Sequence, residues 1–164
     1  MRNSVLLLGF IFMLLMPSCG FKEKHEAVEF YNKITNINDT LFRMTTAWHD
    51  TLDRAVLKKN YSNLPAPRTD LGAFISRSRA MLGDMVPTPE NEKLKDAEES
   101  LLEARAQRVA DIYPVFEPLS ELTPKETVAK NLALIRGDVD SEKAGIDTVK
   151  RFLKVYAEKY RMKK

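Results

Sequence analysis

The chain is poor in the residues from which most enzyme active sites are built. Its 164 residues include one cysteine, which excludes an intrachain disulfide, and two histidines, His25 and His49. These histidines lie about 24 residues apart in one expected helix, roughly 36 Å by helical rise, so no site can use both. No pair of nucleophile and base is legible elsewhere. We therefore predict a protein that is not an enzyme and that needs no cofactor.

Metal ligands are equally few. His49 and Asp53 share a helix face at i, i+4, but one histidine and one carboxylate make a weak site. No second pair of ligands is in register with them. The sequence therefore predicts no metal site.

Glycine and runs of β-branched residues are also scarce. Glycine occurs six times, whereas Leu, Ala, Glu, Lys and Arg are abundant, which is typical of helical proteins. The 26 basic and 23 acidic residues nearly balance. Nucleic-acid-binding proteins carry a clustered basic excess, so this balance argues against a nucleic-acid partner.

A long hydrophobic run occurs once, at the N-terminus. Twelve apolar residues, Val5–Met16, follow the positive charge of Arg2. The run is shorter than the roughly 20 residues that span a bilayer, and it matches the apolar region of a signal peptide. The only cysteine, Cys19, then follows a small residue, Ser18. This segment resembles the signal of a bacterial lipoprotein precursor, in which Met16–Cys19 would be the lipobox.

The resemblance implies cleavage between Ser18 and Cys19, and lipidation of Cys19 with acyl chains such as palmitate. Acyl chains contribute roughly 0.8 kcal/mol per buried CH₂, and two or more give stable anchoring. Gly20 stands where lipoproteins retained in an inner membrane typically carry Asp, which implies an outer-membrane destination. An ordinary signal peptide, or an uncleaved anchor with an incidental cysteine, remains the alternative.

Apolar periodicity then predicts four helices. In the first, from about 23 to 59, apolar or small residues recur at alternating spacings of three and four. They are Ala27, Phe30, Ile34, Ile37, Leu41, Met44 and Trp48. The second helix should begin at Thr69 or Asp70 and stop before Pro87. The third should begin at Pro89.

Prolines and caps set the later boundaries. Pro114 and Pro118 predict a kink or break near 112–118, since each removes a backbone donor and clashes with the preceding turn. Thr123 should cap the last helix in a capping box. That helix should run from 124 to about 161, because its apolar phase is unbroken across Gly137. The rival is a pair of helices hinged after that glycine.

These segments predict an all-α fold: an antiparallel four-helix bundle with three long helices and one short, after the signal segment. The expected domains are a signal peptide at 1–18 and a single bundle at 19–164. The linker Asn60–Arg68 could run back along the bundle as a proline-rich strap. A groove beneath it would involve Tyr61, Leu64 and Trp48. In the alternative, Tyr61 and Leu64 pack the strap shut and Trp48 belongs to the core.

Glu142 is the one charged residue in the apolar stripe of the last helix. It could be a buried acid that pairs with Arg105 or Arg108 and fixes the register of the helices. The expectation that we favoured is a small shift of the stripe that leaves Glu142 in solvent.

Together these features predict a membrane-anchored bacterial envelope lipoprotein with a non-catalytic, protein-binding or structural bundle. Its partners would be the membrane, through lipidated Cys19, and another envelope or extracellular protein. The alternative is a bundle that binds a small ligand or lipid in the groove under residues 60–68.

Overall fold

The described part of the chain is entirely helical. The computed structural model describes residues 18–162, and the side chains of 18–21 and 137–141 lie outside that description. It contains four α-helices and one 3₁₀ helix, in chain order α2 (Ser18–Lys58), α3 (Pro65–Gly83), α4 (Glu92–Asp111), η1 (Tyr113–Phe116) and α5 (Lys125–Lys159). Residues 18–162 include no strand. The predicted all-α class is confirmed.

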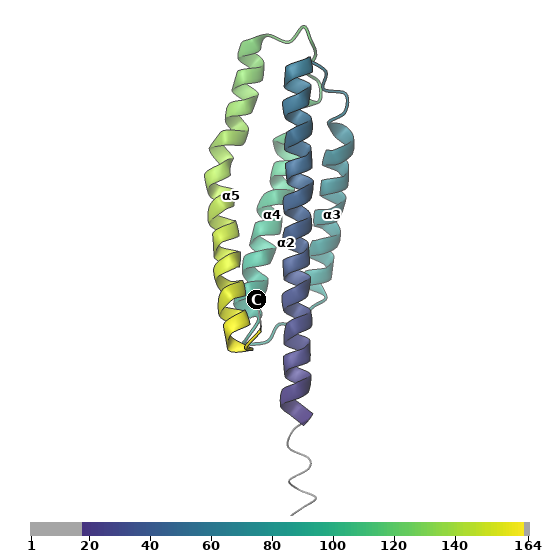
Figure 1. Cartoon of the computed structure of the whole chain (residues 1–164). Coiled ribbons are helices and arrows are strands. Elements are labelled where there is room, and N and C mark those ends of the chain that lie inside the picture. Colours follow the sequence, from purple (N-terminus) through teal and green to yellow (C-terminus); the bar gives the residue numbers. More distant parts are fainter. Residues whose placement is uncertain (1–17, 163–164) are drawn as a thin grey trace, which may run out of the picture.

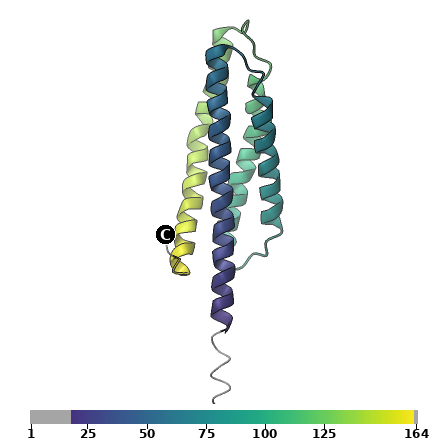
Figure 2. The ribbon, with the colours of Figure 1, turned by 45° about the vertical axis from the view of Figure 1, so that its right-hand side comes forward.

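The four α-helices lie side by side along a common direction (Figure 1). α4 packs against both α3 and α5, α2 packs against α3, and α2 contacts α5 more sparsely. The N-terminal part of α2 extends beyond the ends of the other helices in both views (Figure 2). Because α2 and α5 contact each other sparsely, a cavity remains between them, which is described below.

The apolar stripe predicted for the first helix forms the core face of α2. Its buried members follow the alternating spacing and continue it by two more residues, being Ala27, Phe30, Ile34, Ile37, Leu41, Trp48, Leu52 and Ala55. Met44 is partly buried against the same core. One face of a long helix therefore supplies a continuous apolar surface, as the heptad pattern predicts.

The connection after α2 differs from the expected strap. α3 begins at Pro65, so the segment 65–68 is the first turn of a helix rather than an extended link. The first N–H groups of a helix have no partner within it, so Pro65 and Pro67 are tolerated there without loss of a hydrogen bond. Tyr61 and Leu64 are buried in the core. Our expectation that helix 2 begins at Thr69 or Asp70 was wrong, because the two prolines fit the first turn of a helix and do not delay its start.

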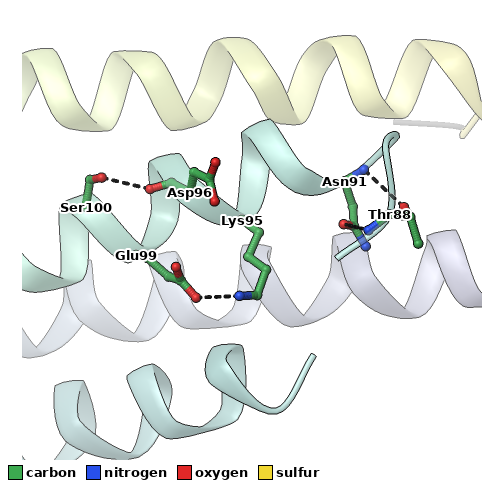
Figure 3. Close-up of polar contacts among 6 residues, drawn as sticks. All are labelled: Thr88, Asn91, Lys95, Asp96, Glu99 and Ser100. Atoms are coloured by element: carbon green, nitrogen blue, oxygen red, sulfur yellow. Dashed lines mark hydrogen bonds and ion pairs between the residues drawn. The ribbon is translucent and has the colours of Figure 1, made fainter. Parts of the chain in front are cut away.

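α4 begins at Glu92, three residues after the expected Pro89, because a turn precedes it. The Thr88 N–H donates to Asn91 Oδ1 at 2.8 Å, and the Asn91 N–H donates to Thr88 Oγ1 at 3.3 Å (Figure 3). Farther along the helix, Lys95 and Glu99 form an ion pair at 2.7 Å (Figure 3). The reciprocal bonds of Thr88 and Asn91 close the turn from which α4 starts.

The predicted break near 112–118 is confirmed. α4 ends at Asp111, and Pro114 lies in the short 3₁₀ helix that follows. α3 and α4 therefore have similar lengths of 19 and 20 residues, against 41 for α2 and 35 for α5. The expectation of three long helices and one short was wrong, because the break ends α4 instead of bending it.

α5 is a single helix that continues through Gly137, as predicted. Its start differs in detail from the expected capping box. Pro124 occupies the N-cap position, and no side chain caps the helix there. Thr123 Oγ1 instead accepts a hydrogen bond from the Ser120 N–H at 2.9 Å. The cap prediction was wrong because this hydroxyl stabilises the preceding turn.

Candidate functional site

Three charged side chains lie on the buried face of α4. Glu98 is 0 % exposed, and Arg105 and Arg108 are also buried. Spacings of seven and three residues put them on one face of the helix. Charged side chains are almost never fully buried unless they are paired, so this face is the most unusual feature of the described core.

Glu142 of α5 pairs with both arginines. Arg105 Nε donates to Glu142 Oε1 at 2.9 Å, and Arg108 Nη1 donates to Glu142 Oε2. The glutamate is itself largely buried. The favoured expectation that Glu142 is solvated was wrong, and the alternative, a buried acid paired with arginine, is confirmed. Two arginines of α4 therefore meet one carboxylate of α5 in the interior.

Glu98 lies deeper in the core and has fewer partners. Asn38 of α2 donates through Nδ2 to Glu98 Oε2 at 2.8 Å and to the Ile34 carbonyl at 3.0 Å. Glu98 Oε1 is buried and accepts no hydrogen bond. Burial raises the pKa of Glu98 to about 7, and the bond from Asn38 and the charge of Arg105 only partly oppose this rise. The carboxyl is therefore poised between its neutral and charged forms near neutral pH.

A cavity of about 340 Å³ lies between α2 and α5 beside this cluster. Polar and apolar side chains line it together, namely Thr35, Asn38, Asp39, Phe42, Arg105, Ile146, Val149, Lys150 and Leu153. Two of the lining residues carry buried polar atoms without a hydrogen-bond partner, Thr35 Oγ1 and Arg105 Nη1. These two atoms are themselves shielded from solvent, so the cavity has a mixed polar and apolar wall without exposing them.

A second, more open groove of about 550 Å³ lies between α4 and α5. Arg105, Arg108 and Glu142 line it. Of these three residues, Arg105 also lines the α2–α5 cavity. Arg108 and Glu142 line the groove but not the cavity.

The end of the core near η1 is aromatic. The rings of Trp48 and Tyr113 stack with centroids 3.6 Å apart and planes 8° apart, and Phe116 meets Trp48 edge-on at 6.1 Å. His49 contacts the edges of the same stack. Burial lowers the pKa of His49, although the charge of Glu142 opposes this effect. His49 is therefore neutral at neutral pH, in an aromatic environment.

The described residues contain no group of three or more His, Cys, Asp or Glu side chains that could hold a metal ion. In the same part of the chain, no helix has both the length and the apolar character needed to cross a bilayer.

The residues predicted for a ligand groove, Trp48, Tyr61 and Leu64, are all buried in the core. The α2–α5 cavity and the α4–α5 groove are lined by other residues. The proposed lipidation and cleavage residues, Cys19 and Ser18, fall in the first turn of α2, and their side chains lie outside the described residues. Residues 1–17 of the predicted signal also lie outside them.

Sequence reasoning missed Glu98, Asn38 and Thr35. A signal for Glu98 exists, because five of the seven buried positions of α4 follow alternating spacings of four and three. These positions are Leu94, Glu98, Leu101, Arg105 and Arg108. If this spacing alone had been followed, whatever the residue type, Glu98, Arg105 and Arg108 would have been predicted to lie in the core. No comparable pattern marks Asn38 and Thr35, which lie beside the α2 stripe.

The geometry is the only guide to function beyond the sequence itself. Comparisons of this chain with protein-family models, with curated proteins and with solved structures find no match.

Proposed function

We propose that this chain is a lipoprotein of the bacterial envelope, anchored in the outer membrane through Cys19 after cleavage behind Ser18. Its helices form an antiparallel four-helix bundle that binds another envelope or extracellular protein and catalyses no reaction. Contacts between helices that are neighbours in the sequence support the bundle, as does the alternating chain direction in Figure 1.

The observation that carries the proposed partner is the apolar surface at the end opposite the anchor. α2 begins one residue before Cys19 and continues for 41 residues, roughly 60 Å by helical rise. Leu57 in its last turn is 82 % exposed, and Leu122, just before α5, is 87 % exposed. The end of α2 and the start of α5 both lie at the top of Figure 1. Exposed apolar side chains at the free end of a tethered rod suit contact with a second protein.

Intact mass spectrometry of the protein extracted from its native membrane tests the anchor. We expect a mass equal to residues 19–164 plus acyl chains, and loss of the acyl mass in a Cys19→Ala variant. A mass without lipid, or one that retains residues 1–18, would overturn the anchor.

Site-specific photo-crosslinking in living cells tests the partner. We place the crosslinker at Leu57 or Leu122 and, as a matched control, at Val86, which is 80 % exposed but lies between α3 and α4 at the other end. We expect one discrete crosslinked protein from positions 57 and 122 and none from position 86. The crosslink from position 122 should disappear when Leu57 is changed to Asp. Equal products from all three positions would contradict a distal binding surface.

A further inference from the structure

We propose that a groove between α2 and the end of α5 binds the headgroup of an anionic phospholipid, in the membrane to which Cys19 would be anchored. The groove has a volume of about 310 Å³. Tyr31 of α2 lines one side of it, and the last turns of α5 with the residues just after them line the other. The inference rests on the proposed anchor, and it concerns a surface separate from Leu57 and Leu122.

The groove is cationic. Lys150, Lys154 and Arg161 line it together with a single carboxylate, that of Glu158. All four residues are exposed. Lys150 and Lys154 lie four residues apart, so their like charges repel each other on one face of α5. An anion bound between the two ammonium groups would offset this repulsion.

Most of this positive charge is not neutralised within the protein. In the part of the chain whose side chains are described, Lys150 and Arg161 form no ion pair. Lys154 Nζ lies 3.9 Å from a carboxylate oxygen of Glu158, and both side chains are 66 % exposed. Exposed ion pairs of this kind contribute little to stability, so an external anion can compete for Lys154 at low cost.

The groove lies at the anchored end of the bundle. The ring centroids of Phe30 and Tyr156 are 5.5 Å apart, which aligns this part of α5 with the first turns of α2. Burial raises the pKa of Tyr160, and the charge of Glu23 raises it further, so Glu23 lies close to Tyr160. Glu23 follows Cys19 by four residues, or about 6 Å of helical rise. Figure 1 shows the end of α5 and the start of α2 at the same end of the molecule.

An anionic phospholipid suits this arrangement. A guanidinium such as that of Arg161 can donate two parallel hydrogen bonds to one phosphate, and lysine ammonium groups bind phosphate as point charges. Leu153 and Met162 also line the groove and offer apolar surface to the glycerol backbone. Lys150 lies about 14 Å of helical rise before the end of α5, so the bundle must lean toward the bilayer on this side for all three cations to bind.

Acetylation of lysines, read by peptide mass spectrometry, tests the groove. The lipidated full chain is reconstituted in vesicles of phosphatidylcholine, alone or mixed three to one with phosphatidylglycerol. We expect Lys150 and Lys154 to react about fivefold more slowly on the anionic vesicles, because a cation beside anionic lipid gains about 1 kcal/mol. High salt should remove this protection. Lys93 is the matched control, since it lines the α4–α5 groove with Phe152 and is exposed on another face. Its rate should not change.

The outcomes separate the groove from the anchor. Protein that floats with both kinds of vesicle but shows no protection of Lys150 and Lys154, or equal slowing of Lys93, would overturn the groove alone. Protein that floats with neither vesicle would overturn the anchor and the groove together. Protection by inorganic phosphate on phosphatidylcholine vesicles would identify a site for free phosphate and contradict a lipid ligand.

A pair of variants tests whether the position of the charge matters. Arg161→Gln should reduce the protection of Lys150 and Lys154 at least about twofold, because one of three cations is lost. Arg136→Gln removes the same charge from the first half of α5 and should leave the protection unchanged. Both arginines are exposed, so neither change disturbs the core. An equal effect of the two variants would show that net charge, and not the groove, attracts the bilayer.

Discussion

Glu142 joins two buried arginines of α4 to one point on α5. An apolar residue at this position could pack against α4 in more than one register. A carboxylate bonded to Arg105 and Arg108 permits only one alignment of α4 and α5. The gain in specificity has a cost, because burying ions removes their hydration. The residue-scale predictions concern this balance.

Replacing Glu142 with Ala should lower the free energy of unfolding by about 3–5 kcal/mol, since Arg105 is left buried without its carboxylate. Urea denaturation followed by circular dichroism measures the change. Glu103→Ala is the matched control, because Glu103 forms a half-exposed ion pair with Arg79 between α3 and α4. That variant should lose less than about 1 kcal/mol. A similar loss in both variants would contradict a special role for the buried cluster.

Glu98→Gln should stabilise the protein in a pH-dependent manner. The pKa of Glu98 is about 7 in the folded protein and near 4.5 when the group is unperturbed, so ionisation is harder after folding. Ionisation of Glu98 therefore destabilises the folded wild-type protein. This loss of stability is absent below pH 4.5, grows as the pH rises to 7 and levels off above it, at up to roughly 3 kcal/mol. Glutamine cannot ionise and can still accept the bond from Asn38.

Urea denaturation at pH 4 and pH 8 measures this effect. At pH 8 the Glu98→Gln variant should exceed the wild type by about 1–3 kcal/mol, whereas at pH 4 the two should agree closely. A stability difference that is the same at both pH values would show that the carboxyl does not titrate in this range.

At the scale of the element, the end of α2 offers a test of backbone strain. Lys59 follows the helix with φ of 52°, and the Asn60 N–H donates to the Ala55 carbonyl at 3.0 Å. This left-handed termination favours glycine, because other residues pay a steric cost there. Lys59→Gly should therefore raise the free energy of unfolding by about 0.5–1 kcal/mol. Lys58→Gly, one residue earlier and still helical, should lower it by a similar amount. Thermal denaturation of both variants checks the opposite signs.

α2 begins at Ser18, five residues before the predicted start at about 23. Its end and both ends of α5 were close to those predicted from sequence, because long alternating apolar stripes define a helix whatever its tertiary partners are. The start of α3 was not, because Pro65 and Pro67 fit a first helical turn as well as a linker. Local chemistry alone does not distinguish these cases. Burial of Leu64 against the rest of the core, which no local pattern reports, accompanies the earlier start.

The candidate cavity was harder to predict than the helices. Arg105, Arg108 and Glu142 could be connected from helical phase, and one of the two expectations for Glu142 did so. Thr35 was not identifiable, because a threonine beside an apolar stripe is ordinary. Only three-dimensional packing shows that Thr35 lines the cavity and that its hydroxyl is buried without a hydrogen-bond partner.

At the scale of the molecule, the two halves of α5 differ in packing. Residues 125–136 include no fully buried side chain, whereas Val149 and Tyr156 farther along are buried. A hydrogen bond from Asn131 Nδ2 to the Val115 carbonyl at 3.1 Å ties the first half to η1. Few buried contacts mean a low cost of local opening.

We therefore expect residues 125–136 to exchange amide hydrogens faster than residues 34–41 of α2. Both segments are helical, so the comparison isolates packing from backbone hydrogen bonding. Hydrogen–deuterium exchange with peptide mass spectrometry measures the difference. Equal protection of the two segments would mean that α5 opens only with the whole molecule.

The order in which the helices pack also sets how quickly the chain can find its structure. α2 contacts α3, α3 contacts α4 and α4 contacts α5, so each main interface closes only a short loop. Proteins dominated by such local contacts fold on the order of microseconds to milliseconds. A chain that emerges unfolded would thus expose its apolar stripes only briefly. Rapid burial of those stripes limits the time in which two unfinished copies can stick together.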